Sequence, residues 1–525
     1  MTGTRSLLRL VLRLDRVWLT VWVLVIALTP VATAASYKKT YPTPESLRGV
    51  SDVISNASLV ALNGPLFRAT LGGLTAWKIG ITELILVALM SLLTVVRHTR
   101  NEEETGRLEL LGSGVVGRYA PLTAALLAVC LANLTLVVLI ALFLVGVGFP
   151  AAGSLALGLS IGLTGVLFAG VGAVAAQLTQ SARSANGIAI AVLGVAYLLR
   201  AVGDTGPIWL TWLSPVGWAL RMRPYAGERW WAAVLIVALA VLLTAVAYQL
   251  VGRRDIDAGL LPQRPGPAVA APGLRSPFGL AWRLQRGTLL AWVVAMVLSG
   301  AVMGGAANGI AHFNASAQVS DLLARLGGRK VLVDSYLAAV FGIIGLVAAC
   351  YTVQVTLRLR AEEAAGRLEP LLATRVGRVR WAASHLVFAL LGTAVLLLVA
   401  GLGAGLAYGA QAHDLGHQVP RLLGAAMVQL PAAWVLAGFG VALFGLVPRL
   451  AALAWAGLIA CAVLLELGVL LGLSHWVVDA SPFAHVPKLP GSAFTAMPLV
   501  WLTAIAAVLL GAGLVGFRRR GITSG

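Results

Sequence analysis

The chain has 525 residues, of which 59% are hydrophobic and 11% charged. A typical soluble domain is about 45–50% apolar and about 25% charged, so this composition excludes an ordinary soluble protein and indicates one that lies in a bilayer. The formal net charge of +19 does not indicate a nucleic-acid-binding protein, because the basic residues lie mostly beside apolar segments, as membrane topology requires.

Residues 5–16, "RSLLRLVLRLDR", form an amphipathic segment that predicts a helix on the membrane surface. Apolar runs long enough to cross a bilayer, about 20 residues each, then follow in two sets of six. The sequence therefore predicts an all-α membrane protein with about twelve transmembrane helices. The predicted spans are residues 17–35, 79–97, 120–147, 154–178, 186–202, 230–251, 288–306, 336–356, 383–409, 422–447, 451–472 and 497–516.

The two sets of six are separated by residues 253–273, which are rich in Pro and Gly and read as a tether. We therefore divide the chain into two homologous halves, residues 1–262 and 263–525. Internal repeats of this kind are common in transporters. Each half also closes with an apolar run followed by arginines, "GRRD" at 252–255 and "FRRR" at 517–520.

Basic residues predict the orientation of the helices. With the N-terminus in the cytoplasm, 25 of the 39 Lys and Arg residues lie on the cytoplasmic side, and the C-terminus lies there too. Three arginines, Arg221, Arg223 and Arg229, oppose this bias, but they share one long outer segment, and long segments count less in the rule.

Two charged segments follow the second span of each half, "RNEEETGRLELLGSGVVGR" at 100–118 and "RAEEAAGRLEPLLATRVGR" at 360–378. They are identical at eleven of nineteen positions. Each reads as the end of a helix, a break at Gly106 or Gly366, and a short helix with leucines on one side. A loop that only crossed between helices would not need this repeated charge pattern.

The second copy, within 359–381, resembles the signature loop of ABC-2 type exporter permeases, which has an acidic pair, a glycine, a Leu-Glu-x-Leu-Leu stretch and a small or basic end. The first copy departs from that pattern at "LLGSG". The fused twelve-helix layout is similar to that of actinobacterial antibiotic and multidrug exporters of the tetronasin-exporter type.

This resemblance implies that each loop is a coupling helix that docks on a separate ATPase subunit. It implies a permease in the bacterial cytoplasmic membrane that exports hydrophobic compounds, such as antibiotics, drugs or lipid-like molecules. Two ATPase copies would bind one chain, and ATP and Mg would be held by them. The coupling residues would be Glu102, Glu103, Gly106, Arg107 and Glu109, with Glu362, Glu363, Gly366, Arg367 and Glu369.

The chain itself is not expected to be an enzyme or to bind a cofactor. A P-loop needs a Gly-Lys-Ser/Thr sequence to hold phosphates, and none of the five lysines follows a glycine. The cysteines Cys130, Cys350 and Cys461 all lie in predicted spans, so neither a disulfide framework nor a metal site is expected. The motif "GLSIG" at 158–162 lies within a predicted helix and indicates a small-residue packing face.

Charged residues inside spans are candidates for function. Here they are Glu83, Arg200 and Glu466. Aligning the sequences of the two halves at Arg183 and Arg449 places Arg200 at the position that corresponds to Glu466, which suggests that these two residues form an ion pair. The alternative is that both lie near the outer headgroups and need no partner. The sequence pattern assigns no residue to substrate contact.

Two other functions remain open. An ion-coupled secondary drug transporter of the major-facilitator kind also has six plus six helices, but its Gly-x-x-x-Asp-Arg-x-Gly-Arg-Arg loop is absent here. A signal transmitter or assembly factor driven by an ATPase would have the same loops and would differ only in transport assays.

Overall fold

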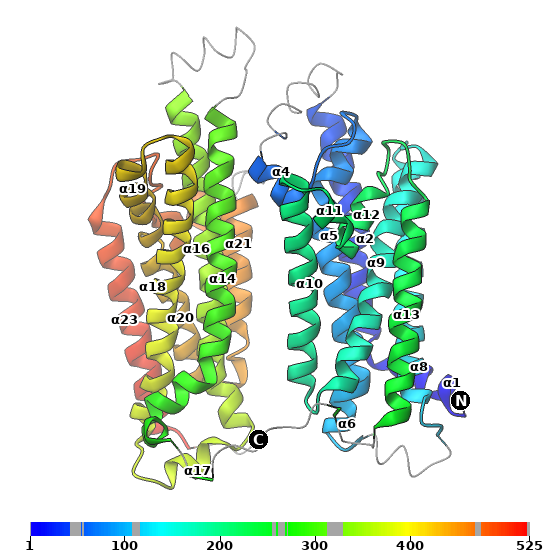
Figure 1. Cartoon of the computed structure of the whole chain (residues 1–525). Coiled ribbons are helices and arrows are strands. Elements are labelled where there is room, and N and C mark those ends of the chain that lie inside the picture. The colour runs from blue at the N-terminus through cyan, green and yellow to red at the C-terminus, as the bar shows by residue number, and fades with distance from the viewer. Residues whose placement is uncertain are drawn as a thin grey trace. The chain divides into compact units, whose positions relative to one another are not determined.

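The structure is a computed structural model, and it describes part of the chain (Figure 1). The chain divides into two compact units, Met1–Pro265 and Gly266–Gly525, whereas the predicted division lies between residues 262 and 263. The structure describes residues 2–41, 54, 57–107, 116–254, 259–260, 268–269, 271–311, 329–467 and 474–521, without the side chains of 57–58, 272, 275, 308–311, 329–330 and 466–467.

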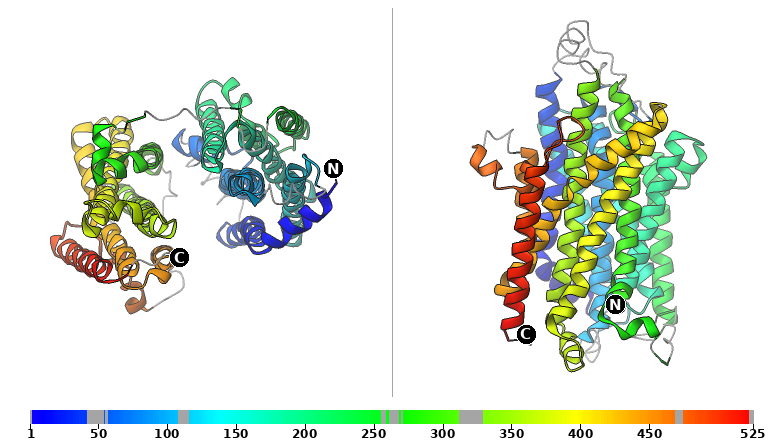
Figure 2. Two further views of the ribbon diagram at one scale, coloured as in Figure 1. Left: turned by 90° about the horizontal axis from the view of Figure 1, so that it is seen from below. Right: turned by 90° about the vertical axis from the view of Figure 1, so that its left-hand side faces the viewer.

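The first unit is a bundle of long helices that run roughly parallel to one another (Figures 1 and 2). Side-chain caps begin three of its helices: Thr70, Ser181 and Ser214 accept hydrogen bonds from the backbone N–H groups of Gly73, Ser184 and Gly217. Its helices are α1 Thr4–Leu14, α2 Arg16–Thr40, α4 Ala57–Asn63, α5 Leu71–Val96, η1 Arg97–Asn101, α6 Glu102–Glu104, α8 Ala120–Gly146, α9 Ala151–Leu178, α10 Ala182–Thr205, α11 Trp209–Trp212, α12 Pro215–Arg221 and α13 Trp231–Arg253.

The second unit is built in the same way (Figure 2). Its long first helix continues without the break that separates α1 from α2 in the first unit. Its helices are η2 Pro272–Arg275, α14 Pro277–Ala311, α16 Arg329–Ala364, α17 Leu368–Leu372, α18 Arg378–Gln411, α19 Leu415–Met427, α20 Leu430–Leu446, η3 Pro448–Leu450, α21 Leu453–Leu467, α22 His475–Val478, η4 Pro482–His485 and α23 Ala496–Arg519.

Within the described residues, 11 helices are long and apolar enough to cross a membrane. The twelfth predicted span, 451–472, coincides with the shorter apolar helix α21, which is described only as far as Leu467. The apolar stretch that corresponds to the predicted span 422–447 begins earlier than predicted, because α19 and α20 together form one stretch from Leu415 to Leu446. No strand occurs in the described ranges, so the all-α, multi-span fold class is confirmed.

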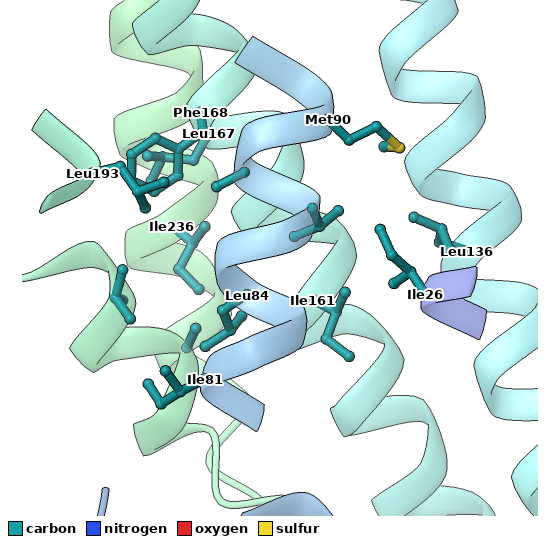
Figure 3. Close-up of a cluster of buried hydrophobic side chains, with 14 of the residues drawn as sticks. Ile26, Ile81, Leu84, Met90, Leu136, Ile161, Leu167, Phe168, Leu193 and Ile236 are labelled. Atoms are coloured by element: carbon teal, nitrogen blue, oxygen red, sulfur yellow. The ribbon is translucent and has the colours of Figure 1, made fainter. Parts of the chain in front are cut away.

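The core of the first unit lies around α5 and α9 (Figure 3). Leu84 and Met90 of α5, Ile161 and Phe168 of α9, and Ile236 of α13 are almost completely buried there. The helix α9 packs against α5, α8, α10 and α13. The helix α9 therefore lies at the centre of its unit. A helix that is packed on nearly every side has apolar or small residues all round, as α9 does.

Glycines allow the close helix contacts. A Cβ atom at Gly158 would lie 2.8 Å from the carbonyl oxygen of Val137 on α8, so the predicted packing face at 158–162 is confirmed. In the second unit, a Cβ at Gly445 of α20 would lie 1.9 Å from the carbonyl oxygen of Gly513 on α23. Both pairs of helices approach until their backbones touch.

Candidate functional site

The first charged loop begins as a continuation of α5. The helix runs on through the π-helical turn η1 and the short helix α6 (Figure 1). Gly106 then adopts a left-handed conformation, φ 72°, and donates its N–H to the carbonyl oxygen of Glu103. This is the usual way in which a glycine ends a helix. Residues 108–115, and with them Glu109 and the predicted short helix, lie outside the described residues.

The second loop repeats this geometry and can be followed further. Gly366 has φ 68° and donates to the carbonyl oxygen of Glu363. The short helix α17 follows, and its Leu368 is buried in an apolar cluster with Leu359 and Trp381. Glu369, in the first turn of α17, is exposed. The predicted break and short leucine-faced helix are therefore confirmed for the second copy.

An ion pair between a half-buried glutamate and an exposed arginine crosses each glycine. Arg107 lies 3.4 Å from Glu102, and Arg367 lies 2.8 Å from Glu362. The two arginine side chains are 66% and 63% exposed, so they remain available to a partner. We call Arg107 and Arg367 the turn arginines.

The second glutamate of each loop is buried instead. Glu103 accepts two hydrogen bonds from Arg254, at 2.7 and 2.8 Å, and a third from Arg100 at 2.9 Å. Arg254 lies just beyond α13, and its Nε donates to the side chain of Gln177 at the end of α9, at 2.6 Å. Two parallel N–H···O bonds of this kind are the strongest form of Arg–carboxylate pair.

The second unit contains the same bidentate pair. Glu363 accepts hydrogen bonds from both terminal nitrogens of Arg520, at 2.6 and 2.8 Å. Arg520 lies just beyond α23, and its guanidinium stacks over the rings of Phe444 and Phe517. Arg360 adds a weaker contact, 3.7 Å from Glu363. We call Arg254 and Arg520 the anchor arginines.

The far end of each loop binds the same anchor. Arg118 donates to the backbone carbonyl oxygen of Arg254, and Arg378 donates to that of Arg520 at 2.6 Å. Each loop is thus held at both ends by the residue that follows the last helix of its own unit. The anchor arginines are not among the site residues that the sequence predicts. The signal for them is the arginines that follow the last apolar run of each half, at 252–255 and 517–520.

The start of each loop also meets other helices of its unit. Asp15, buried between α1 and α2, pairs with Arg97 and His98 at 3.0 and 2.5 Å. Glu104 accepts a hydrogen bond from the backbone N–H of Ala182, at the first residue of α10. In the second unit, Arg358 donates to the backbone of Leu284 on α14. The end of the second span therefore joins the first and last spans of each unit.

Comparison with known proteins identifies the family. The chain is 46% identical over 525 residues to the multidrug efflux system permease protein Rv1217c of Mycobacterium tuberculosis, and the match covers 99% of this chain and 95% of that protein. The chain belongs to this family of multidrug efflux permeases. The family model for the C-terminal domain of the permease Rv1217c matches residues 274–518. The expected membership of the ABC-2 type exporter permeases is thereby confirmed.

The intramembrane charges of this permease lie in unlike surroundings. Glu83 on α5 is fully buried, and neither carboxylate oxygen has a hydrogen-bond partner among the described residues. Arg200 on α10 is also fully buried, but it lies 3.6 Å from Asp204 and donates to the backbone of Val60 and Leu62. The side chain of Glu466 lies outside the described residues, so its pairing with Arg200 stays a prediction.

Proposed function

We propose that this permease is the membrane-spanning subunit of an ATP-driven exporter. It would lie in the bacterial cytoplasmic membrane with both termini in the cytoplasm. It would move hydrophobic compounds, such as drugs, antibiotics or lipid-like molecules, out of the cell. The name of the Mycobacterium tuberculosis relative, a multidrug efflux system permease, supports the transport class.

The observation that carries the ATP-driven part is the repeated loop. Each copy presents an exposed arginine, paired with a half-buried glutamate across a left-handed glycine, and the start of each loop is bonded to other helices of its unit. Charged groups on a rigid support give a reversible protein interface its register and specificity. Two such loops fit two copies of an ATPase subunit, and those subunits would hold the ATP and Mg.

In this proposal the partner closes on ATP and displaces both loops. The spanning helices then change from an inward-facing to an outward-facing arrangement, and the compound must bind these two states with different affinity. This chain's own contribution is to receive the movement at the turn arginines and pass it to the helices.

The test is charge reversal at the turn arginines in the permease purified together with an ATPase encoded beside it. We expect R107E with R367E to lower both the co-purified ATPase and the drug-stimulated hydrolysis at least tenfold, because like charges facing each other across an interface cost several kcal/mol. The matched control is K39E, a charge reversal at an exposed residue at the opposite end of the first unit.

Two results would refute the proposal. In proteoliposomes, drug transport that is driven by a proton gradient and needs no nucleotide would make the chain a secondary transporter. Full ATPase binding by the R107E/R367E variant would show that the partner does not use these loops.

A further inference from the structure

Each charged loop is fastened at its beginning and at its end to one residue. In the first unit, Glu103 precedes the glycine turn and Arg118 follows the loop, and both bind Arg254. In the second unit, Glu363 and Arg378 bind Arg520 in the same way. The loop and the residue after the last spanning helix therefore form one bonded assembly.

The same link arises twice from different sequence spacings. The loop glutamates are 260 residues apart, whereas the anchor arginines are 266 residues apart. Local copying of one short segment does not produce this, since the two partners are 151 and 157 residues apart in the chain, one after the second span and one after the last. The bidentate pair is present in both units although its surroundings differ, with Gln177 beside Arg254 and two phenylalanine rings beside Arg520.

Burial gives the link its rigidity. The side chains of Glu103 and Glu363 are 3% and 0% exposed, and the anchor arginines are 11% and 15% exposed. Separating such a pair would leave a buried carboxylate without its countercharge, which is strongly unfavourable. The link therefore favours movement of the loop and the last helix together over movement of the loop alone.

We propose that Arg254 and Arg520 are positioning residues that tie each loop to the last spanning helix of its unit, so that a displaced loop moves α13 or α23 with it. The inference rests on the proposed function, because the displacement comes from the partner. It adds a second route by which that displacement enters the helix bundle. Besides α5 or α16, which the loop extends, the displacement also reaches α13 or α23.

The second unit offers the cleaner test, because Arg360, the other arginine beside Glu363, is 29% exposed and 3.7 Å away, whereas Arg100 beside Glu103 is fully buried and hydrogen-bonded to it. The variants are R520Q, E363Q and the double variant E363Q/R520Q. The matched control is R519Q, which removes an exposed arginine one residue earlier. Each is assayed for folded protein by size-exclusion chromatography, for ATPase co-purification, and for drug efflux per folded molecule.

A positioning role and a merely structural role predict different results. R520Q leaves the buried Glu363 with only the weaker contact to Arg360, so the amount of folded protein should fall. The double variant should recover it, since both charges of the bidentate pair are gone. If Arg520 positions the loop, efflux per folded molecule stays at least fivefold below wild type in the double variant, with ATPase co-purification unchanged. Wild-type efflux in the double variant overturns the inference.

A covalent bridge gives the rescue experiment. In a background with the three native cysteines replaced, E363C/R520C should transport poorly, and linking the two thiols with a flexible bifunctional reagent should restore at least half of the efflux. If the bridged protein stays inactive, this result argues against the proposal that the second loop and α23 move together. If instead wild type transports without any nucleotide, the proposed function fails, and that outcome is distinct from both results.

Discussion

Single buried charges in this permease differ in whether the fold pairs them. Arg200 contacts the carboxylate of Asp204, two backbone carbonyl oxygens and the ring of Tyr197, so contacts within its own unit explain its burial. Glu83 is equally buried, and its carboxyl group has no hydrogen-bond partner among the described residues. Leaving such a group unpaired costs about 1–3 kcal/mol. A residue retained at that cost is a candidate for function.

We therefore expect E83M to stabilise the permease and to impair transport. Removing the unpaired carboxyl group should raise the unfolding temperature in detergent by a few degrees, while efflux falls several-fold. The control L84M, at the next position of the same helix, keeps volume and polarity and should change neither quantity appreciably. An E83M variant that is both more stable and fully active would show that the carboxyl group has no role in transport.

At the scale of helices, close packing depends on where glycines stand. On α23, a Cβ atom at Gly513 would lie 2.4 Å from the carbonyl oxygen of Val441, whereas one at Gly511 would have no atom within 4 Å. The same helix thus contains one glycine that its neighbour α20 requires and one that it does not. Because α23 leads directly to Arg520, its seating on α20 also sets the position of the second loop.

This contrast predicts opposite effects for the same substitution. G513A should destabilise the permease by about 1–3 kcal/mol through overpacking. G511A should be neutral or stabilising by up to about 1 kcal/mol, since alanine favours a helix. The unfolding temperature of each variant in one detergent measures both effects. Equal values for the two would mean that α20 and α23 do not pack through Gly513.

At the scale of the whole molecule, the sequence predicted the long apolar helices, because each span is a long apolar run, although 11 rather than twelve helices of the described residues are long enough to cross a membrane. It also predicted the loops, because their charges stand out in an apolar chain. It did not predict that Glu103 and Glu363 are buried, since burial depends on Arg254 and Arg520, which lie about 150 residues further along the chain. Contacts between segments so far apart leave no local pattern.

The two units also have separate hydrophobic cores, one around α5 and α9 and another around α16 and α18. Each unit contains its own loop, its own anchor arginine and its own last helix, so the bidentate pair described for each loop is formed within one unit. A chain cut between Pro265 and Gly266, at the division between the units, should therefore remain functional when both pieces are expressed together. Drug efflux by cells that express both pieces measures this.

The position of the cut tests the anchor as well. A first piece that ends at residue 265 keeps Arg254, whereas one that ends at residue 253 keeps every spanning helix of its unit but loses that arginine. The longer piece should support efflux with the second unit, and the shorter should not, although both should accumulate in the membrane. Because α13 is complete in both pieces, a difference in efflux between them follows from the loss of Arg254 and the short segment after it. Equal efflux would mean that α13 does not need to be tied to the loop.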